Sequence, residues 1–252
     1  MIIRGKDIAE SVYTRLGNRT LDLGILVAGT DPVTDSFVRS KERAAKRLGV
    51  TVVRKVIPES ATTDDALQAL EELAASTDGV IVQLPLPETL DTETILAAIP
   101  PEKDVDGISA APRVRPPVAG ALEEILRVAE VSIPGSRAMV VGSGRLVGKP
   151  CADFLRDSGA EVTVVGKGDS LDALRAADIV VLGAGQPRMI RPEHVRRGAV
   201  LVDAGTSESK GRVVGDADSA CAEKAAVFTP VPGGVGPIAV SMIFKNLFEL
   251  TS

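Results

Sequence analysis

Short runs of Val, Ile, Leu and Ala alternate along this chain with longer segments in which apolar residues recur at helical spacing. Unbroken apolar strands that alternate with helices are typical of parallel sheets covered on both faces. The pattern predicts strands at 21–28, 50–57, 80–84, 138–141, 162–165, 179–182, 199–203 and 226–228. It predicts helices at 34–48, 63–75, 119–128, 148–158, 171–176 and 237–250. We therefore expect an α/β fold.

The predicted elements form two series, which separate near residues 110–120 after a Pro-rich stretch. Each series contains enough strands to form a sheet of its own and enough helices to cover that sheet. The chain has 252 residues, which suits one large domain or two modest ones. We expect two α/β domains.

Composition narrows the functional classes. Aromatic residues make up 2% of the chain, so the core is expected to be aliphatic. The 29 basic residues are outnumbered by 34 acidic ones, which disfavours nucleic acid as a partner. One histidine and two isolated cysteines predict no metal site, and they fit a reducing cytoplasm. No stretch is apolar enough to cross a membrane, so no membrane partner is expected.

A glycine-rich turn follows the strand predicted at 138–141. Its glycines, Gly142, Gly144 and Gly148, precede a predicted helix, as in turns that bring backbone N–H groups to a dinucleotide pyrophosphate. A plain strand-to-helix turn is the alternative. Lys167 stands between two glycines after the next strand, where NAD sites usually carry an acidic residue. A cation there favours NADP over NAD, unless Lys167 is simply a solvated turn residue.

A lysine interrupts the apolar face of the helix predicted at 34–48. At 100° per residue, Lys41 shares one face with Phe37, Ala44 and Leu48. A lysine there either extends its ammonium to solvent or is a functional amine whose pKa burial lowers. Gln83 and Asp106 are its candidate polar partners, and we expect Lys41 within hydrogen-bonding reach of Gln83.

Five segments, in this order, resemble the bifunctional methylenetetrahydrofolate dehydrogenase/cyclohydrolase family over nearly the whole chain. They are Asp31-Pro32 before the Lys41 helix, VQLPLP at 82–87, KDVDG at 103–107, VGKP at 147–150 and TPVPGGVGP at 229–237. The resemblance implies a catalytic α/β domain (1–117 with the last helix, 237–252) and a Rossmann-like NADP-binding domain (118–236), with a cleft between them. It also implies a homodimer.

The resemblance implies two reactions: NADP-dependent oxidation of 5,10-methylenetetrahydrofolate, and hydrolysis of the methenyl product to 10-formyltetrahydrofolate. The implied catalytic residues are Lys41, Gln83 and Asp106. Implied folate contacts come from Phe37, Val82, Leu84, Pro85, Pro232, Gly233 and Gly234. Implied cofactor contacts come from Gly142, Ser143, Gly144, Arg145, Val147, Gly148, Lys167, Thr206 and Gly236. Pro237 is expected near the first position of the last helix.

Four departures from the family pattern stand out. Phe37 replaces the usual tyrosine, and Ser143-Gly144 replaces an Arg-Ser pair of the glycine loop. The 107–120 segment is shorter than usual, and Gly205-Thr206-Ser207 stands where the family has Gly-Ile-Asn. The alternatives to a bifunctional enzyme are therefore a relative that retains one activity, a non-catalytic folate- or nucleotide-binding homologue, and another two-domain dehydrogenase such as the shikimate type.

Overall fold

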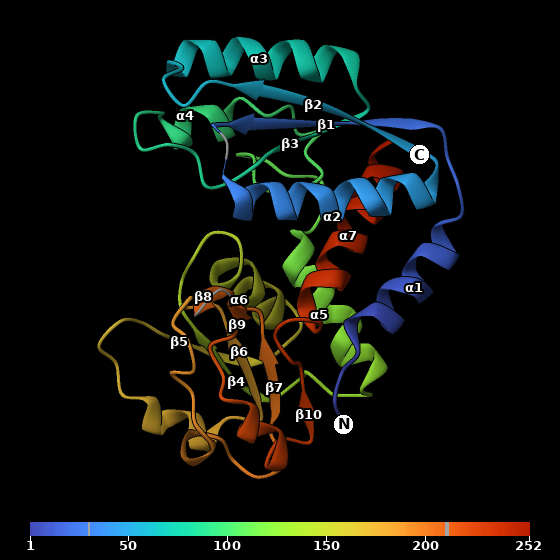
Figure 1. Ribbon diagram of the computed structural model, residues 1–252. Coiled ribbons are helices and arrows are strands. Elements are labelled where there is room, and N and C mark those ends of the chain that lie inside the picture. The colour runs from blue at the N-terminus through green and yellow to red at the C-terminus, as the bar shows by residue number, and fades with distance from the viewer. Residues whose placement is uncertain (30, 210–211) are drawn as a thin grey trace. The chain divides into compact units, whose positions relative to one another are not determined.

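The computed structural model describes residues 1–29, 31–209 and 212–252. The chain divides into two compact units, shown in Figure 1. One consists of Val12–Pro117 and Val240–Ser252, and the other of Met1–Ser11 and Val118–Ala239. This division differs from the expected one at the N-terminus, because Met1–Ser11 group with the second unit. Helices α1 (Gly5–Leu16) and α7 (Val235–Leu250) each contribute to both units.

The Val12–Pro117 unit is built on a three-stranded parallel sheet of order β2-β1-β3. Its elements are β1 (Leu21–Ala28), α2 (Pro32–Leu48), β2 (Val50–Ile57), α3 (Thr63–Ser76), β3 (Gly79–Val82) and α4 (Thr92–Ala97). Helices α2 and α3 lie on opposite faces of the sheet (Figure 1). The central strand β1 divides its side chains accordingly: Ile25 packs toward α2 and α7, and Leu26 toward α3 and α4.

Local sequence sets the ends of α2, the helix that carries Lys41. The Asp31 carboxylate accepts the Thr34 N–H at 2.8 Å, and Pro32 opens the helix where no backbone donor is needed. Gly49 ends the helix in a left-handed conformation, with φ of 73°. The ends of α2 are therefore defined by its own residues.

The Val118–Ala239 unit is built on a five-stranded parallel sheet of order β10-β7-β6-β4-β5. Its strands are β4 (Arg137–Val141), β5 (Glu161–Val165), β6 (Ile179–Leu182), β7 (Val200–Asp203) and β10 (Val227–Phe228), with a hairpin of β8 (Ser207–Ser209) and β9 (Arg212–Val214). Its helices are α5 (Pro117–Val128), α6 (Gly148–Asp157) and the 3-10 turns η1 (Leu171–Ala176), η2 (Pro192–His194) and η3 (Ser219–Glu223). Helix α6 packs on β4, β5 and β6, while Leu174 of η1 and Cys221 of η3 belong to a core cluster that includes Val180 and Leu182 of β6. The expected α/β fold is confirmed.

Two local expectations need correction. The helix predicted at 171–176 is a 3-10 helix. The last helix begins at Val235, so Pro237 is its third residue and not its first. Proline is tolerated there because the first four N–H groups of a helix have no partner within it.

No helix among the described residues is both long and apolar enough to cross a membrane. Within the same residues, no three His, Cys, Asp or Glu side chains are grouped so as to hold a metal ion.

Candidate functional site

A hydrogen bond joins Lys41 and Gln83, two of the three proposed catalytic residues. The Lys41 Nζ donates to the Gln83 Oε1 at 2.7 Å. Gln83 directly follows β3, and its backbone N–H continues the sheet by donating to the Leu26 carbonyl at 2.9 Å. Its side-chain Nε2 donates to the Leu84 carbonyl at 2.8 Å, which directs the amide oxygen to Lys41. The glutamine thus presents an acceptor to the amine in a fixed orientation.

Asp106 adds a negative charge to this pair. Burial lowers the pKa of Lys41, and the charge of Asp106 partly opposes that change. Burial also raises the pKa of Asp106 to about 6; the Lys41 charge acts against this rise and the Asp104 charge adds to it. Asp104 itself is fully buried and accepts the Ser109 N–H at 2.7 Å. The result is an amine and a carboxyl that both titrate closer to neutrality than their free counterparts.

Phe37, which was expected to share the apolar face of α2 with Lys41, is instead 46% exposed. In this turn α2 packs through Val38, which is fully buried, and the packed face continues through Ala45 and Leu48. A helical turn presents one or two side chains to the core, and here Val38 takes that place.

The residues that follow β3 differ in their surroundings. Val82 is 1% exposed and belongs to the core cluster that packs against α3. Leu84 is half-buried against the same cluster, and Pro85 is exposed. Of these three candidate substrate contacts, only Leu84 and Pro85 therefore present side-chain surface.

The second proposed substrate segment, residues 232–234, forms a tight turn before α7. Pro232 and Gly233 are exposed, whereas Gly234 is buried and donates its N–H to the Pro230 carbonyl at 2.7 Å. Gly5, at the start of α1, donates its N–H to the Gly233 carbonyl at 2.8 Å. A Cβ on Gly5 would stand 1.8 Å from the Gly234 carbonyl oxygen. The contact between Gly5 and this turn had no counterpart in the sequence patterns.

The glycine loop lies between β4 and α6, at the carboxyl end of the sheet. Gly142 has a φ of 95°, and a Cβ on Gly148 would stand 2.1 Å from the Gly142 carbonyl oxygen, so the turn requires glycine at both positions. Around Gly144 a Cβ would meet nothing within 4 Å. No side chain caps α6, since its N-cap residue is Val147. An uncapped helix N-terminus beside an open glycine is suited to a phosphate group.

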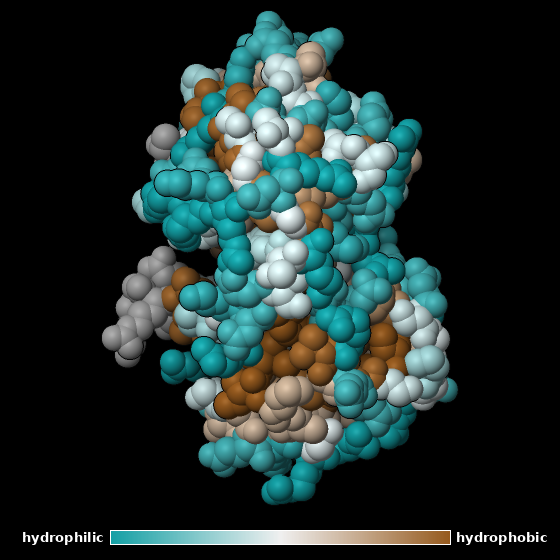
Figure 2. All heavy atoms as spheres, turned by 90° about the vertical axis from the view of Figure 1, so that its right-hand side faces the viewer, coloured by the Kyte–Doolittle hydropathy of each residue, from teal (hydrophilic) through white to brown (hydrophobic). Residues whose placement is uncertain are grey.

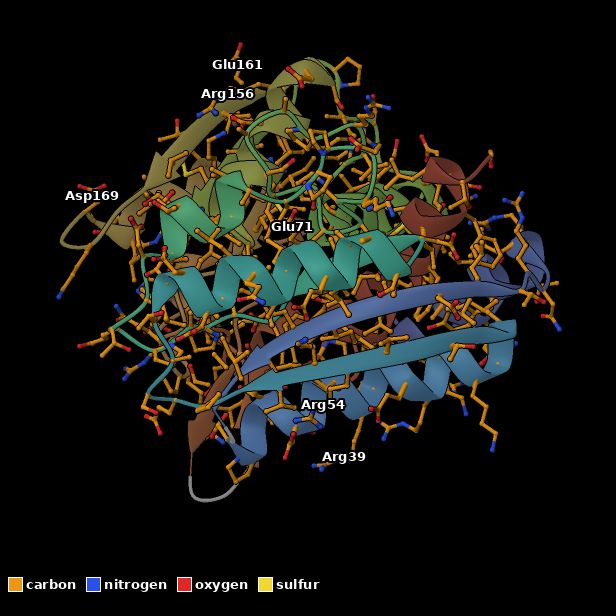
Figure 3. All side chains as sticks on the ribbon, turned by 90° about the horizontal axis from the view of Figure 1, so that it is seen from above. Arg39, Arg54, Glu71, Arg156, Glu161 and Asp169 are labelled. Carbon is orange, nitrogen blue, oxygen red and sulfur yellow. The ribbon has the colours of Figure 1, made fainter. Side chains whose placement is uncertain are left out.

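The other proposed cofactor contacts lie in the glycine loop, in the segments after β5 and β7, and at the start of α7. Ser143, Arg145, Lys167 and Thr206 are exposed, as is Gly236 at the start of α7. Lys167 lies in the turn after β5, which Asp169 closes by accepting the Gly166 N–H at 2.8 Å. Figure 3 shows Asp169 and Glu161 at opposite ends of this strand.

The predicted site residues thus fall into two groups. Lys41, Gln83 and Asp106 belong to the Val12–Pro117 unit, while the glycine loop, Lys167 and Thr206 belong to the other. Sequence reasoning missed two buried carboxylates of that second unit, Asp203 and Asp216, which bind the backbone of its loops. The available signal was limited to Asp203, an acidic residue that ends an apolar strand, and it does not indicate the partners of either carboxylate.

Comparisons with known proteins agree with the resemblance seen in the sequence. Residues 3–106 match the family described as "Tetrahydrofolate dehydrogenase/cyclohydrolase, catalytic domain". Residues 116–252 match its counterpart, "Tetrahydrofolate dehydrogenase/cyclohydrolase, NAD(P)-binding domain". The bifunctional protein FolD of Methanospirillum hungatei is 36% identical over 270 aligned residues, which cover 99% of this chain and 97% of that protein.

Solved structures give the same result. The Trypanosoma brucei methylenetetrahydrofolate dehydrogenase-cyclohydrolase, crystallised with NADP and an inhibitor, superimposes with a TM-score of 0.93 at 33% identity, covering 99% of this chain and 96% of that one. The Campylobacter jejuni FolD enzyme gives a TM-score of 0.92 at 27% identity, covering 99% and 98%. The chain belongs to the tetrahydrofolate dehydrogenase/cyclohydrolase family.

Proposed function

We propose that this protein oxidises 5,10-methylenetetrahydrofolate with NADP and then hydrolyses the 5,10-methenyl product to 10-formyltetrahydrofolate. The observation that carries this proposal is the 2.7 Å hydrogen bond from Lys41 Nζ to Gln83 Oε1, beside the charge of Asp106. Membership of the family and its named relatives supports both activities.

Lys41 moves the protons of the hydrolysis. The methenyl carbon carries positive charge, so water attacks it, and the neutral Lys41 amine takes a proton from that water. The resulting ammonium then gives a proton to N5 as the bond between this carbon and N5 breaks. The hydroxyl proton leaves to solvent as the formyl C=O forms on N10. General acid–base catalysis of this kind typically contributes about 10²–10⁴ in rate.

Gln83 and Asp106 prepare the lysine for that work. Burial lowers the pKa of Lys41, which increases the share of neutral amine near neutral pH. The Gln83 oxygen fixes where the amine points, and it accepts a hydrogen bond in either protonation state. We assign Asp106 a second role in holding the pterin, as the resemblance to the family implies.

The remaining folate contacts are proposed on α2, at the end of β3 and just after it, and in the turn before α7. They involve the residues Phe37, Val82, Leu84, Pro85, Pro232, Gly233 and Gly234. Because the Val82 side chain is buried, its contribution is assigned to the backbone.

The residues of the glycine loop fit a dinucleotide. When bound, NADP accepts the hydride from the methylene carbon. The loop backbone and the uncapped start of α6 would hold the phosphates. Lys167 would pair with the 2′-phosphate, which favours NADP over NAD. The other proposed contacts are Gly142, Ser143, Gly144, Arg145, Val147, Gly148, Thr206 and Gly236.

We also propose a homodimer in the cytoplasm. Ile2 pairs with Phe228 of β10, and Met1 and Ile2 are 58% and 61% exposed. Figure 2 shows hydrophobic side chains gathered on the lower half of the face that it presents. An exposed apolar patch supports self-association. Cys151 and Cys221 are both free and buried, which supports a reducing compartment.

An absorbance assay for methenyltetrahydrofolate, run with NADP and NAD in parallel, tests the dehydrogenase. The same signal, followed from added methenyltetrahydrofolate without nucleotide, tests the cyclohydrolase. We expect both activities, with NADP preferred. One activity alone would favour the single-activity alternative, and the absence of both would favour the non-catalytic homologue.

A further inference from the structure

Asp216 occupies an unusual place for a carboxylate: it lies two residues after the end of β9 and is fully buried. Its Oδ2 accepts the N–H groups of Ala184 and Gly185 at 2.7 and 3.1 Å. Its Oδ1 accepts the N–H of Gln186 at 2.7 Å. One side chain therefore binds three successive N–H groups of the loop that follows β6.

Asp203, at the end of β7, binds the backbone on the other side of Asp216. Its carboxylate is 1% exposed and accepts the N–H groups of Gly205, Asp216 and Ala217 at 3.0, 3.2 and 2.8 Å. The two carboxylates thus link the loop after β6, the loop after β7 and the segment after β9.

Glycines show how closely these parts pack. A Cβ on Gly205 would stand 2.2–2.4 Å from the carboxylate atoms of Asp216, and one on Gly215 would stand 2.1 Å from Asp203 Oδ2. The loop after β6 also contacts the glycine loop: a Cβ on Gly142 would stand 2.7 Å from the Gly183 carbonyl oxygen, and one on Gly183 2.3 Å from Val147. A chain of contacts therefore runs from Asp216 through the 183–186 loop to the glycine loop.

Burying a carboxylate is costly unless its oxygens are hydrogen-bonded. Burial raises the pKa of both residues, that of Asp203 to about 6, although each accepts three backbone N–H groups. Covering a sheet does not require two buried carboxylates. What they do is fix the loops at the carboxyl ends of β4, β6 and β7, which is the edge where ligands of parallel α/β sheets bind.

We propose that Asp216 is a positioning residue of the cofactor site: it sets the conformation of the 184–186 loop, and through Gly183 that of the glycine loop, so that the dinucleotide binds. Asp203 in turn fixes the positions of Asp216 and of the loop that contains Thr206 relative to each other. This inference rests on the proposed NADP site and adds to it a residue that does not touch the cofactor.

Asp216→Asn tests the proposal with little change in volume. An amide has one acceptor oxygen, so its NH₂ group must face either the Gln186 N–H or the N–H groups of Ala184 and Gly185. We expect the affinity for NADPH, measured by fluorescence titration, to fall about tenfold or more. We expect a matching rise in KM for NADP, with folate KM and nucleotide-free cyclohydrolase activity unchanged.

Gly205→Ala provides an independent test that keeps Asp216 itself. The added methyl group would displace the Asp216 carboxylate, and it should therefore weaken NADPH binding in the same way. Asp218→Asn is the matched control. That carboxylate caps η3 by accepting the Ala220 N–H at 2.9 Å, and its loss should leave NADPH affinity as in the wild type.

The outcomes separate the two claims. Wild-type protein that does not bind NADPH would refute the cofactor proposal, and this inference with it. Wild-type binding that Asp216→Asn and Gly205→Ala leave unchanged would overturn the inference alone. A parallel loss of cyclohydrolase activity in both variants would also overturn it, because Asp216 would then support the fold generally. If Asp216→Asn does not fold, Gly205→Ala decides by the same readouts.

Discussion

Phe37 lies one helical turn before Lys41 on α2, where the family pattern has tyrosine. Phe37 is 46% exposed, so a hydroxyl could be added there without entering the core. We expect Phe37→Tyr to raise cyclohydrolase activity several-fold, because a phenol supplies the hydrogen bond that phenylalanine lacks. Initial rates from methenyltetrahydrofolate measure this. Phe37→Leu, which removes the ring, is the comparison variant. A rate in Phe37→Tyr at or below wild type would show that the tyrosine hydroxyl has no role in this chain.

The exposed Lys167 determines cofactor choice in our account. Lys167→Glu should reduce kcat/KM for NADP about tenfold or more and leave that for NAD nearly unchanged, since a carboxylate repels a 2′-phosphate. Lys46→Glu makes the same change in net charge on the exposed side of α2 and controls for it. An unchanged NADP/NAD ratio in Lys167→Glu would refute the assignment.

Asp106 makes stability depend on pH. Its pKa is about 6 in the folded chain against 3.8 as the ordinary value, so between these values the folded state binds more protons than the unfolded state. The contribution of Asp106 to folding stability is therefore fully present below about pH 4 and is lost as pH rises through about 6. In Asp106→Asn there is no carboxyl to titrate, so this variant does not lose stability in that way. We expect the Tm of Asp106→Asn relative to wild type to increase from pH 4 to pH 7 in thermal melts. A difference that stays constant or decreases over this range would contradict the raised pKa.

At the scale of elements, the start of α1 supports the 232–234 turn. A methyl group on Gly5 would clash with backbone, at 1.8 Å from the Gly234 carbonyl oxygen. We expect Gly5→Ala to destabilise the protein by about 1–3 kcal/mol, as overpacking does, and to lower its Tm. Gly236→Ala is the control, because a Cβ there meets nothing within 4 Å. Equal melting temperatures for the two variants would show that the turn accommodates the added methyl group without loss of stability.

The elements also show what a single sequence reveals. Strands β1 and β2 match their predicted bounds, because both are rich in Val, Ile and Leu and lie between clear turns. Helix α1 was not predicted, although Ile8, Val12 and Leu16 recur at helical spacing in it. The β8-β9 hairpin was not predicted because strands of three residues are too short to show a period. The Lys41–Gln83 contact was predictable because a helix face and a strand end meet in a parallel sheet. Asp203 and Asp216 were not, because their partners are backbone groups distant in sequence.

At the scale of the whole molecule, the two proposed chemistries depend on residues of different units. Proton transfer depends on Lys41, Gln83 and Asp106, and cofactor binding on the glycine loop and Lys167. Hydride transfer needs no proton from Lys41. A substitution of this lysine should therefore separate the two activities in one protein.

The most direct test measures both activities in Lys41→Met, which removes the amine and keeps an apolar stem, with Lys46→Met on the exposed side of α2 as control. We expect hydrolysis of methenyltetrahydrofolate to fall about 10²-fold or more in Lys41→Met, while NADP-dependent formation of methenyltetrahydrofolate persists and the Tm stays near that of wild type. Lys46→Met should retain both activities. Cyclohydrolase activity at the wild-type level in Lys41→Met would contradict the central claim that this lysine moves the protons of the reaction.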